Sequence, residues 1–357
     1  MSEYQDHPDQ NAAGTEARKA EHIRICLEEQ VGSSIGGAGF DKYRFEHEAL
    51  PELDWKEVDT SASWFGRRLK APLLVSSMTG GTDEAGRINR YLAEAAQQRG
   101  WAIGLGSMRA AWEKPELADS FQIRREAPDV PIIANVGAVQ LNYGLDADAC
   151  RRLVEMAEAD ALVLHLNALQ EVFQPEGDTN FRHLLRLIEE VCRRSGVPVG
   201  VKEVGWGISP ATAARLADAG AAFIDCAGAG GTSWSQVEKY RARSPLHAAA
   251  AEAFADWGIP TAQCVQSIRL QLPHMTLVAS GGLNTGVDAA KAIALGADLA
   301  GFGRVLLPQA SAGRDSAKAV AMQMERIEFE LRTAMFASGA GTLRELAAGD
   351  KLKPARL

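Results

Sequence analysis

The chain has 357 residues, a length that suits either two to three average domains or one large barrel with extensions. Hydrophobic residues make up 46% of it and charged residues 24%, which is enough for a sizeable core. The formal net charge of −8 argues against a general nucleic-acid binder, which would carry a basic surface. We find neither a membrane-spanning apolar run nor a signal-peptide pattern, and therefore expect a cytoplasmic protein without membrane or nucleic-acid partners.

Cysteine usage points to the same compartment. The five cysteines are scattered and form no CxxC pair: Cys26, Cys150, Cys192, Cys226 and Cys264. An odd, dispersed set is typical of reduced thiols and not of a disulfide framework or a structural zinc site.

The N-terminal part is expected to be an extension of the main fold. Residues 1–15 are polar and aperiodic, which predicts a disordered lead-in. Residues 16–30 show a helical pattern with Ile23 and Leu27 on one side. The start of this helix is basic, with Arg18, Lys19, His22 and Arg24. Such a cluster is either a solvated helix face or a clamp for an anionic ligand.

Residues 32–70 are irregular, and we expect them to form a covering layer or short strands that close the bottom of a barrel. From residue 72 to residue 304 strand-like runs alternate with helical segments. The eight runs are Pro72–Ser76, Ala102–Leu105, Pro131–Asn135, Ala161–His165, Pro198–Lys202, Phe223–Cys226, Thr276–Ala279 and Leu299–Phe302. The clearest helical segments are Asp83–Gln98, Asp146–Ala159, Phe181–Ser195 and Pro210–Ala219.

Eight β units that alternate with helices predict an α/β fold, a (β/α)₈ TIM barrel, over about residues 72–304. A doubly wound open sheet is the alternative, and its glycine fingerprint would follow the first strand. A Gly-Gly turn does follow the first strand here, at Gly80 and Gly81, but glycines of the cofactor-binding type recur after strands six and seven, which favours the barrel. The tail predicts further helices at Ala317–Ala337 and Leu343–Ala348, so residues 16–357 are expected to form one domain.

The strand–turn–helix stretch LVASGGLNTG, residues 277–286, is the first candidate ligand site. Its paired glycines allow a close approach of the backbone to a ligand, and the start of the next helix would offer free N–H groups to an anion. In a TIM barrel the loops after strands seven and eight often hold phosphate.

Lys202 interrupts an apolar run at the end of the fifth strand. An ammonium group buried there requires an anionic partner, because burying an unpaired charge is costly. A lysine close to several glycine clusters suits a flat, phosphorylated cofactor such as FMN better than a simple sugar phosphate.

The motifs at the strand ends, taken together, resemble the type 2 isopentenyl-diphosphate isomerases. The motifs are RKAEHI (residues 18–23), MTGG (78–81), GSMR (106–109), HLN with QE (165–171), KEVGWG (202–207), GGTSW (230–234) and SGGL (280–283). They occur in order between about residues 18 and 308. The RKxEHI opening together with HLNxxQE is specific to this family, whereas each other motif is shared with further FMN barrels.

This resemblance implies an interconversion of isopentenyl diphosphate and dimethylallyl diphosphate with reduced FMN and Mg²⁺. NADPH would serve only to reduce the flavin, and a homotetramer or larger homo-oligomer is implied. The implied FMN-binding residues are Ser77, Met78, Thr79, Ser107, Asn135, Lys202, Thr232, Gly282, Leu283, Asn284, Gly303 and Arg304. The implied substrate-binding residues are Arg18, Lys19, His22, Ser107, Arg109 and Gln170. The implied catalytic residues are Gln170, His165 and Asn167, and Glu171 is the implied metal ligand.

Two positions depart from the family pattern. The family commonly has Arg after Gly-Gly-Leu, where this chain has Asn284, and Arg304 stands where the family often has an apolar pair. We hypothesise that Arg304 replaces the lost guanidinium at the FMN phosphate.

Two other functions fit the sequence less well. An FMN-dependent oxidase or dehydrogenase of 2-hydroxy acids would need a histidine after a late strand, and the first histidine after the GGTSW motif is His247. A non-catalytic flavin- or phosphate-binding module would not need a metal-ligand carboxylate beside a substrate clamp.

Overall fold

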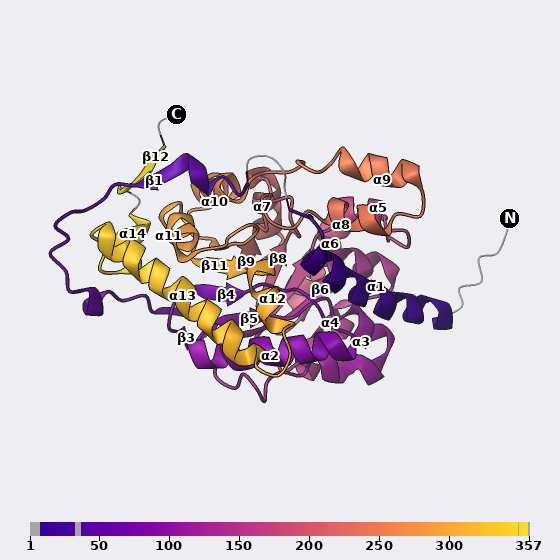
Figure 1. The fold of residues 1–357 in the computed structure, drawn as a ribbon. Coiled ribbons are helices and arrows are strands. Elements are labelled where there is room, and N and C mark those ends of the chain that lie inside the picture. Colours follow the sequence, from indigo (N-terminus) through magenta and orange to yellow (C-terminus); the bar gives the residue numbers. More distant parts are fainter. Residues whose placement is uncertain (1–7, 33–36, 349, 356–357) are drawn as a thin grey trace.

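A closed barrel of eight parallel strands forms the centre of the computed structural model, which describes residues 8–32, 37–348 and 350–355 (Figure 1). The strands are β4 (Leu73–Val75), β5 (Ala102–Gly104), β6 (Ile132–Gly137), β7 (Ala161–His165), β8 (Val199–Lys202), β9 (Phe223–Asp225), β10 (Thr276–Ala279) and β11 (Leu299–Phe302). β11 pairs with β4 and closes the ring. All eight strand-like runs are therefore strands, and the predicted (β/α)₈ barrel is confirmed.

Helices follow the strands and surround the barrel. Those between β4 and β8 are α2 (Asp83–Arg99), α3 (Arg109–Glu113), α4 (Ala147–Met156), α5 (Ala168–Phe173) and α6 (Leu184–Arg194). Those between β8 and β11 are α7 (Pro210–Asp218), α8 (Trp234–Arg241), α9 (Pro245–Glu252), α10 (Thr261–Gln271) and α11 (Gly286–Ala294). The predicted helices are present, with ends that differ by a few residues.

The bottom of the barrel is closed by a hairpin of β2 (Ala62–Trp64) and β3 (Arg67–Leu69), as expected for this stretch. Trp64 is buried against apolar residues of the barrel strands and meets Phe223 edge-to-face at 5.2 Å. Arg67 anchors the hairpin through an ion pair with Asp160 at 2.7 Å. The barrel interior is therefore a packed apolar plug at this end, which leaves only the other end for a ligand.

The N-terminal helix α1 (Pro8–Glu28) begins earlier than predicted, so residues from Pro8 onward are helical, and residues 1–7 lie outside the described part. The predicted apolar side is partly wrong: Ile23 is buried, but Leu27 is 39% exposed. The reason is that α1 turns a largely polar face inward and packs against α8, α2 and α3 at the mouth of the barrel. Its continuation is fixed by the N–H of Ser233, which donates to the Val31 carbonyl at 2.7 Å.

The C-terminal helices are α12 (Leu307–Ala310), α13 (Ser316–Ala337) and α14 (Leu343–Ala347), and α13 packs against α2 and α11. A final strand, β12 (Leu352–Pro354), pairs antiparallel with β1 (Tyr43–Phe45) and ties the C-terminal segment to the stretch that precedes the barrel. Among the described helices none combines the length and apolar character that a membrane crossing requires.

Candidate active site

The carboxyl ends of the eight strands open into one cavity, which α1 borders. The cavity offers about 280 Å³ of space to water-sized molecules, and it opens to solvent at its mouth. Every site residue proposed from the sequence lines this cavity: Arg18, Lys19, His22, Ser77, Met78, Thr79, Ser107, Arg109, Asn135, His165, Asn167, Gln170, Glu171, Lys202, Thr232, Gly282, Leu283, Asn284, Gly303 and Arg304.

Lys202 lies at the end of β8, buried, in register with His165 on β7 and Asp225 on β9. Burial raises the pKa of Asp225, and the Lys202 charge acts in the opposite direction. Asp225 also accepts hydrogen bonds from the Ser280 hydroxyl at 2.6 Å and from the Ala227 N–H at 3.2 Å. The Lys202 ammonium itself donates to the Glu203 carbonyl at 2.5 Å, and among the described residues it forms no direct ion pair. Asp225 is therefore a nearby carboxylate that influences Lys202 through its charge, and the sequence did not indicate it.

The loops after β9 and β10 meet backbone to backbone in the cavity wall. Gly282 has a φ of +79°, and a Cβ built on it would stand 2.5 Å from the Gly230 carbonyl carbon. A Cβ on Gly231 would in turn stand 2.6 Å from the Gly282 nitrogen. The two loops can approach this closely only because these residues have no side chains. Main-chain groups therefore form the cavity surface here.

One expectation for this region is wrong. The start of α11 was expected to offer free N–H groups to an anion, but its first turn is already capped. The Gly286 N–H donates to the Glu330 carboxylate at 2.7 Å, and the Thr285 and Asp288 side chains form a reciprocal capping box. An acidic residue in the first turn also opposes an anionic ligand. A phosphate would therefore meet the glycine loops and not the tip of this helix.

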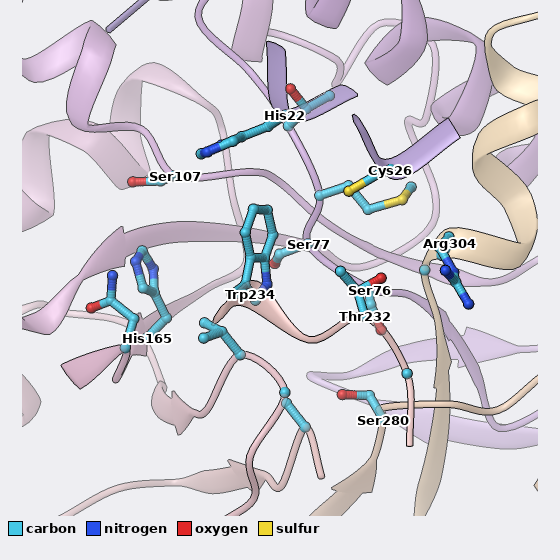
Figure 2. A pocket seen from close by; sticks show the side chains of 18 of the residues that line it. His22, Cys26, Ser76, Ser77, Ser107, His165, Thr232, Trp234, Ser280 and Arg304 are labelled. Carbon is cyan, nitrogen blue, oxygen red and sulfur yellow. The ribbon is translucent and has the colours of Figure 1, made fainter. Parts of the chain in front are cut away.

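Arg304 follows β11 and is exposed at the cavity edge. Within the described residues it has no ion pair or hydrogen bond, and a Cβ built on Gly32 would stand 3.3 Å from its Nη2 atom. Asn284 instead donates to the Gly282 carbonyl at 2.9 Å and stabilises its own turn. In the view of Figure 2, Arg304 lies on the right, His165 and Ser107 lie on the left, and Trp234 lies between them.

Three basic residues of α1, Arg18, Lys19 and His22, line the cavity, whereas Arg24 is exposed and pairs with Glu28 at the surface. Lys19 donates from Nζ to the Ser107 carbonyl at 3.1 Å and lies over the Phe121 ring, 5.4 Å from its centroid. Burial, followed by the nearby Arg18 charge, lowers the pKa of Lys19 to about 7. The solvated-face interpretation of this cluster is therefore wrong for Lys19.

Arg109, on α3, is held by two carboxylates. Its Nε contacts Glu113 at 2.6 Å and its Nη1 contacts Asp178 at 2.5 Å. Asp178 also accepts from the Gln140 amide at 3.0 Å. Asp178 and Gln140 were absent from the sequence-based site, because nothing in the sequence indicates that the loop after α5 folds back onto α3.

Glu171 is buried on α5, and burial raises the pKa of its carboxyl. One oxygen accepts from the Asn167 amide at 2.6 Å and the other from the Asp178 N–H at 2.6 Å. The described residues contain no group of three or more His, Cys, Asp or Glu side chains that could hold a metal ion. Mg²⁺ at Glu171 would therefore depend on ligand oxygens and water, which is common for this ion.

Glu238, on α8, is fully buried. The sequence analysis did not predict it as a site residue. It accepts from His22 at 3.0 Å, from Arg241 at 2.6 Å and from the Gln170 amide at 3.4 Å. Burial raises the pKa of Glu238, but the hydrogen bond from His22 and the charge of Arg241 outweigh burial, so the pKa is lowered. Glu238 thereby fixes α1 and α5 on either side of α8.

Comparisons with known proteins place the chain within a class of flavin enzymes. Residues 170–352 match the model of the FMN-dependent dehydrogenase family. A solved mandelate oxidase with an FMN adduct superposes with a TM-score of 0.66 at 20% identity, covering 97% of this chain and 99% of that one. A lactate oxidase from Pediococcus acidilactici gives a TM-score of 0.68 at 17% identity, covering 100% of this chain and 97% of that one. At such identity the two structures show the fold alone. The fold and the matched model define an FMN-dependent barrel.

Closer relatives identify the family. An isopentenyl-diphosphate delta-isomerase from Oceanobacillus iheyensis is 52% identical, and the match covers 93% of this chain and 95% of the relative. One from Nostoc sp. is also 52% identical, with 94% and 95% covered. This chain belongs to the isopentenyl-diphosphate delta-isomerase family, in its FMN-dependent type 2 form.

Proposed function

We propose that this protein interconverts isopentenyl diphosphate and dimethylallyl diphosphate, with FMN in its reduced form and Mg²⁺ as cofactors. Residues 16–357 would form a single FMN-binding domain. The observation that carries the proposal is that one cavity joins glycine loops and Lys202 with the cations of α1 and the carboxylate of Glu171. A flavin and a metal-bound diphosphate therefore have matching partners in one space.

The residues present fit FMN. Lys202 provides a buried cation for the pyrimidine edge of the ring, and the packed glycines at 230, 231 and 282 provide a backbone surface for the ribityl phosphate. Further FMN contacts are proposed for Ser77, Met78, Thr79, Ser107, Asn135, Thr232, Leu283, Asn284, Gly303 and Arg304. When bound, reduced FMN supplies the acid and base for moving a proton between two carbons.

The diphosphate would lie between α1 and α5. Arg18, Lys19 and Arg109 offer cationic donors, and His22 offers a ring nitrogen on the same side of the cavity. Glu171 fits Mg²⁺ because its two oxygens are already oriented by Asn167 and Asp178. Neutralisation by the metal is needed, because Glu113 and Asp178 offset the charge of Arg109.

The hydrocarbon end of the substrate would lie between the flavin site and the side chains of Gln170, Asn167 and His165. Gln170 and Asn167 are buried, and the Trp234 ring packs against His22 at 5.1 Å. Exclusion of water matters in this part of the cavity, because water would trap the tertiary carbocation of the reaction. The pKa of His165, which burial lowers to about 3, makes it unsuitable as a proton donor near neutral pH.

The remaining features follow from the same proposal. The net reaction is redox-neutral, so NADPH would act only as the flavin reductant, in the cytoplasm. We propose a homotetramer or larger homo-oligomer, which is supported by large apolar side chains exposed outside the cavity. Examples are Val172, Leu246 and Trp257, at 64%, 75% and 60% exposure.

The test is an anaerobic assay of the purified protein with FMN, Mg²⁺ and dithionite or NADPH, followed by separation of the two isomers. Isomerisation only with reduced flavin is expected. Flavin bleaching by a 2-hydroxy acid without isomerisation would support the oxidase alternative instead. That alternative is disfavoured because His247, the histidine it would use, is exposed on α9 and does not line the cavity.

A matched variant separates catalysis from cofactor binding. Gln170→Ala should lower turnover by about a hundredfold while the protein keeps its bound flavin, because the amide lies on the substrate side. Gln174→Ala, which removes another buried amide of the cavity wall, is the control. Normal turnover of Gln170→Ala would remove Gln170 from the proposed catalytic residues.

A further inference from the structure

His165, at the end of β7, and Asn135, on β6, form a hydrogen-bonded pair in the cavity wall. His165 Nδ1 lies 2.9 Å from the Asn135 Oδ1 atom. The Asn135 amide nitrogen donates to the Leu105 carbonyl at 3.0 Å. Rotating the amide by half a turn would place two carbonyl-type oxygens against each other, so Leu105 fixes which Asn135 atom faces the imidazole.

The fixed amide determines the tautomer of His165. An amide oxygen can only accept a hydrogen bond, so the proton of a neutral imidazole must lie on Nδ1. Burial first, and then the charges of Lys202 and Lys19, lower the pKa of His165 to about 3. The ring is therefore neutral at physiological pH, and its Nε2 atom carries a lone pair and no hydrogen.

The Nε2 atom is left available to a ligand. Within the described residues His165 has no other hydrogen bond, and its side chain lines the cavity. Gly137, which lies beside it, keeps this edge of the ring free: a Cβ there would stand 3.2 Å from Nε2 and 3.4 Å from Cε1. His165 Nε2 can therefore accept a hydrogen bond but cannot donate one. Lys202, in register with His165 on the neighbouring strand, can donate but cannot accept.

We infer that His165 accepts a hydrogen bond from the imide N3–H of FMN and that Asn135 is the positioning residue that fixes the required tautomer. This inference rests on the proposed function. Isopentenyl diphosphate consists of a hydrocarbon and phosphate oxygens and has no N–H group. The isoalloxazine ring presents N3–H next to a carbonyl, which matches His165 Nε2 next to Lys202.

The test compares FMN with N3-methylated FMN, which lacks the donor, by equilibrium dialysis and fluorescence quenching. The wild-type protein should bind FMN at least about tenfold more tightly, because the methylated flavin leaves a buried acceptor unpaired. Asn135→Leu keeps the imidazole and its bulk but removes the acceptor for Nδ1–H. Its preference for FMN should fall to about twofold, because the proton can then move to Nε2.

A pH profile distinguishes this role from a structural one. In Asn135→Asp the carboxylate raises the pKa of His165, so the ring becomes protonated as the pH falls and Nε2 becomes a donor. FMN affinity of this variant should decrease toward about pH 5, whereas that of the wild type stays constant. The charged residues that influence His165 among those described are Lys202 on β8 and Lys19 on α1. A uniform loss of affinity at every pH would contradict the inference.

Histidine labelled with ¹⁵N gives a readout independent of affinity. In the FMN-bound protein, a signal that disappears in His165→Gln should show protonated Nδ1 and unprotonated Nε2. Equal affinity of the wild type for both flavins, or an Nε2-protonated ring, would overturn the inference. Failure of the wild type to bind any flavin would instead remove the proposed function, and the inference with it.

Discussion

The two halves of the cavity are built from different material. The proposed flavin half consists mainly of strand ends and main-chain groups, and its glycines after β9 and β10 touch backbone to backbone. The proposed diphosphate half consists of charged side chains from α1, α3, α5 and α8 that are paired with one another. The first half is fixed by the barrel itself, whereas the second depends on a network of ion pairs among separate helices. Changes to the two halves should therefore have different consequences.

The largest expected effect lies in the diphosphate half. Glu171→Gln removes the proposed metal-binding charge and should lower kcat/KM by about a hundredfold and abolish the response to Mg²⁺. Assays across a Mg²⁺ titration measure it, and Glu176→Gln, on the loop after α5, is the control. An unchanged Mg²⁺ response would show that the metal is bound elsewhere.

In the flavin half, Gly282→Ala should cost about 1–3 kcal/mol of stability, since its backbone conformation disfavours a side chain. The Cβ would also push the two glycine loops apart, so the variant should retain less FMN than the wild type. Gly313→Ala is the control, because Gly313 has a φ of +113° with no atom within 4 Å of the new Cβ. Thermal unfolding and flavin content after dialysis measure both. Equal flavin loss in the two variants would indicate backbone strain alone.

A smaller effect tests the chain-specific cation of the flavin half. Arg304→Ala should weaken FMN about tenfold through the loss of a charge-assisted hydrogen bond to phosphate. Riboflavin, which lacks the phosphate, should bind both proteins equally, and this comparison isolates the phosphate contact. Wild-type FMN affinity in Arg304→Ala would refute compensation for Asn284.

The smallest effect is a fraction of a proton in the diphosphate half. An anion bound beside Lys19 raises the pKa of this lysine from about 7. When pyrophosphate and Mg²⁺ bind between about pH 7 and pH 9, Lys19 should therefore take up a proton. Calorimetry in two buffers of different ionisation enthalpy measures this uptake, which Lys19→Met should eliminate. The same lowered pKa makes the free protein gain stability as pH rises from 7 toward 10.5, because only the unfolded chain then binds this proton.

The sequence predicted most of the barrel and little of the ion-pair network. Short apolar runs and glycine turns are local signals, so all eight strands were found at nearly their observed positions. Lys202 was recognised by its place at a strand end, but the neighbouring Asp225 was not. An acid at the end of another short strand carries no signal until the two strands are known to be neighbours.

The diphosphate half depends on contacts between distant parts of the chain. His22 and Glu238 are 216 residues apart, and Arg109 and Asp178 are 69 apart. Helical periodicity also gave a wrong prediction for α1. Leu27 fits the predicted apolar stripe, but its side chain is exposed. The inward face of that helix meets a polar cavity, a case in which the amphipathic rule does not identify the buried side. Only the family resemblance placed Arg18 and Lys19 in the site.

The docking of α1 onto α8 has a consequence for how the protein is made. A ribosome releases α1 first, but the helix that anchors it through Glu238 emerges only after about two-thirds of the translation is complete. The amino terminus therefore waits without its partner while the first six strands of the ring are made. β10 and β11 follow α8 in the chain, so the flavin half, which includes the loops after these two strands, is completed only after α8 has been made. We therefore expect flavin to be captured by the nearly complete chain and not by an early intermediate.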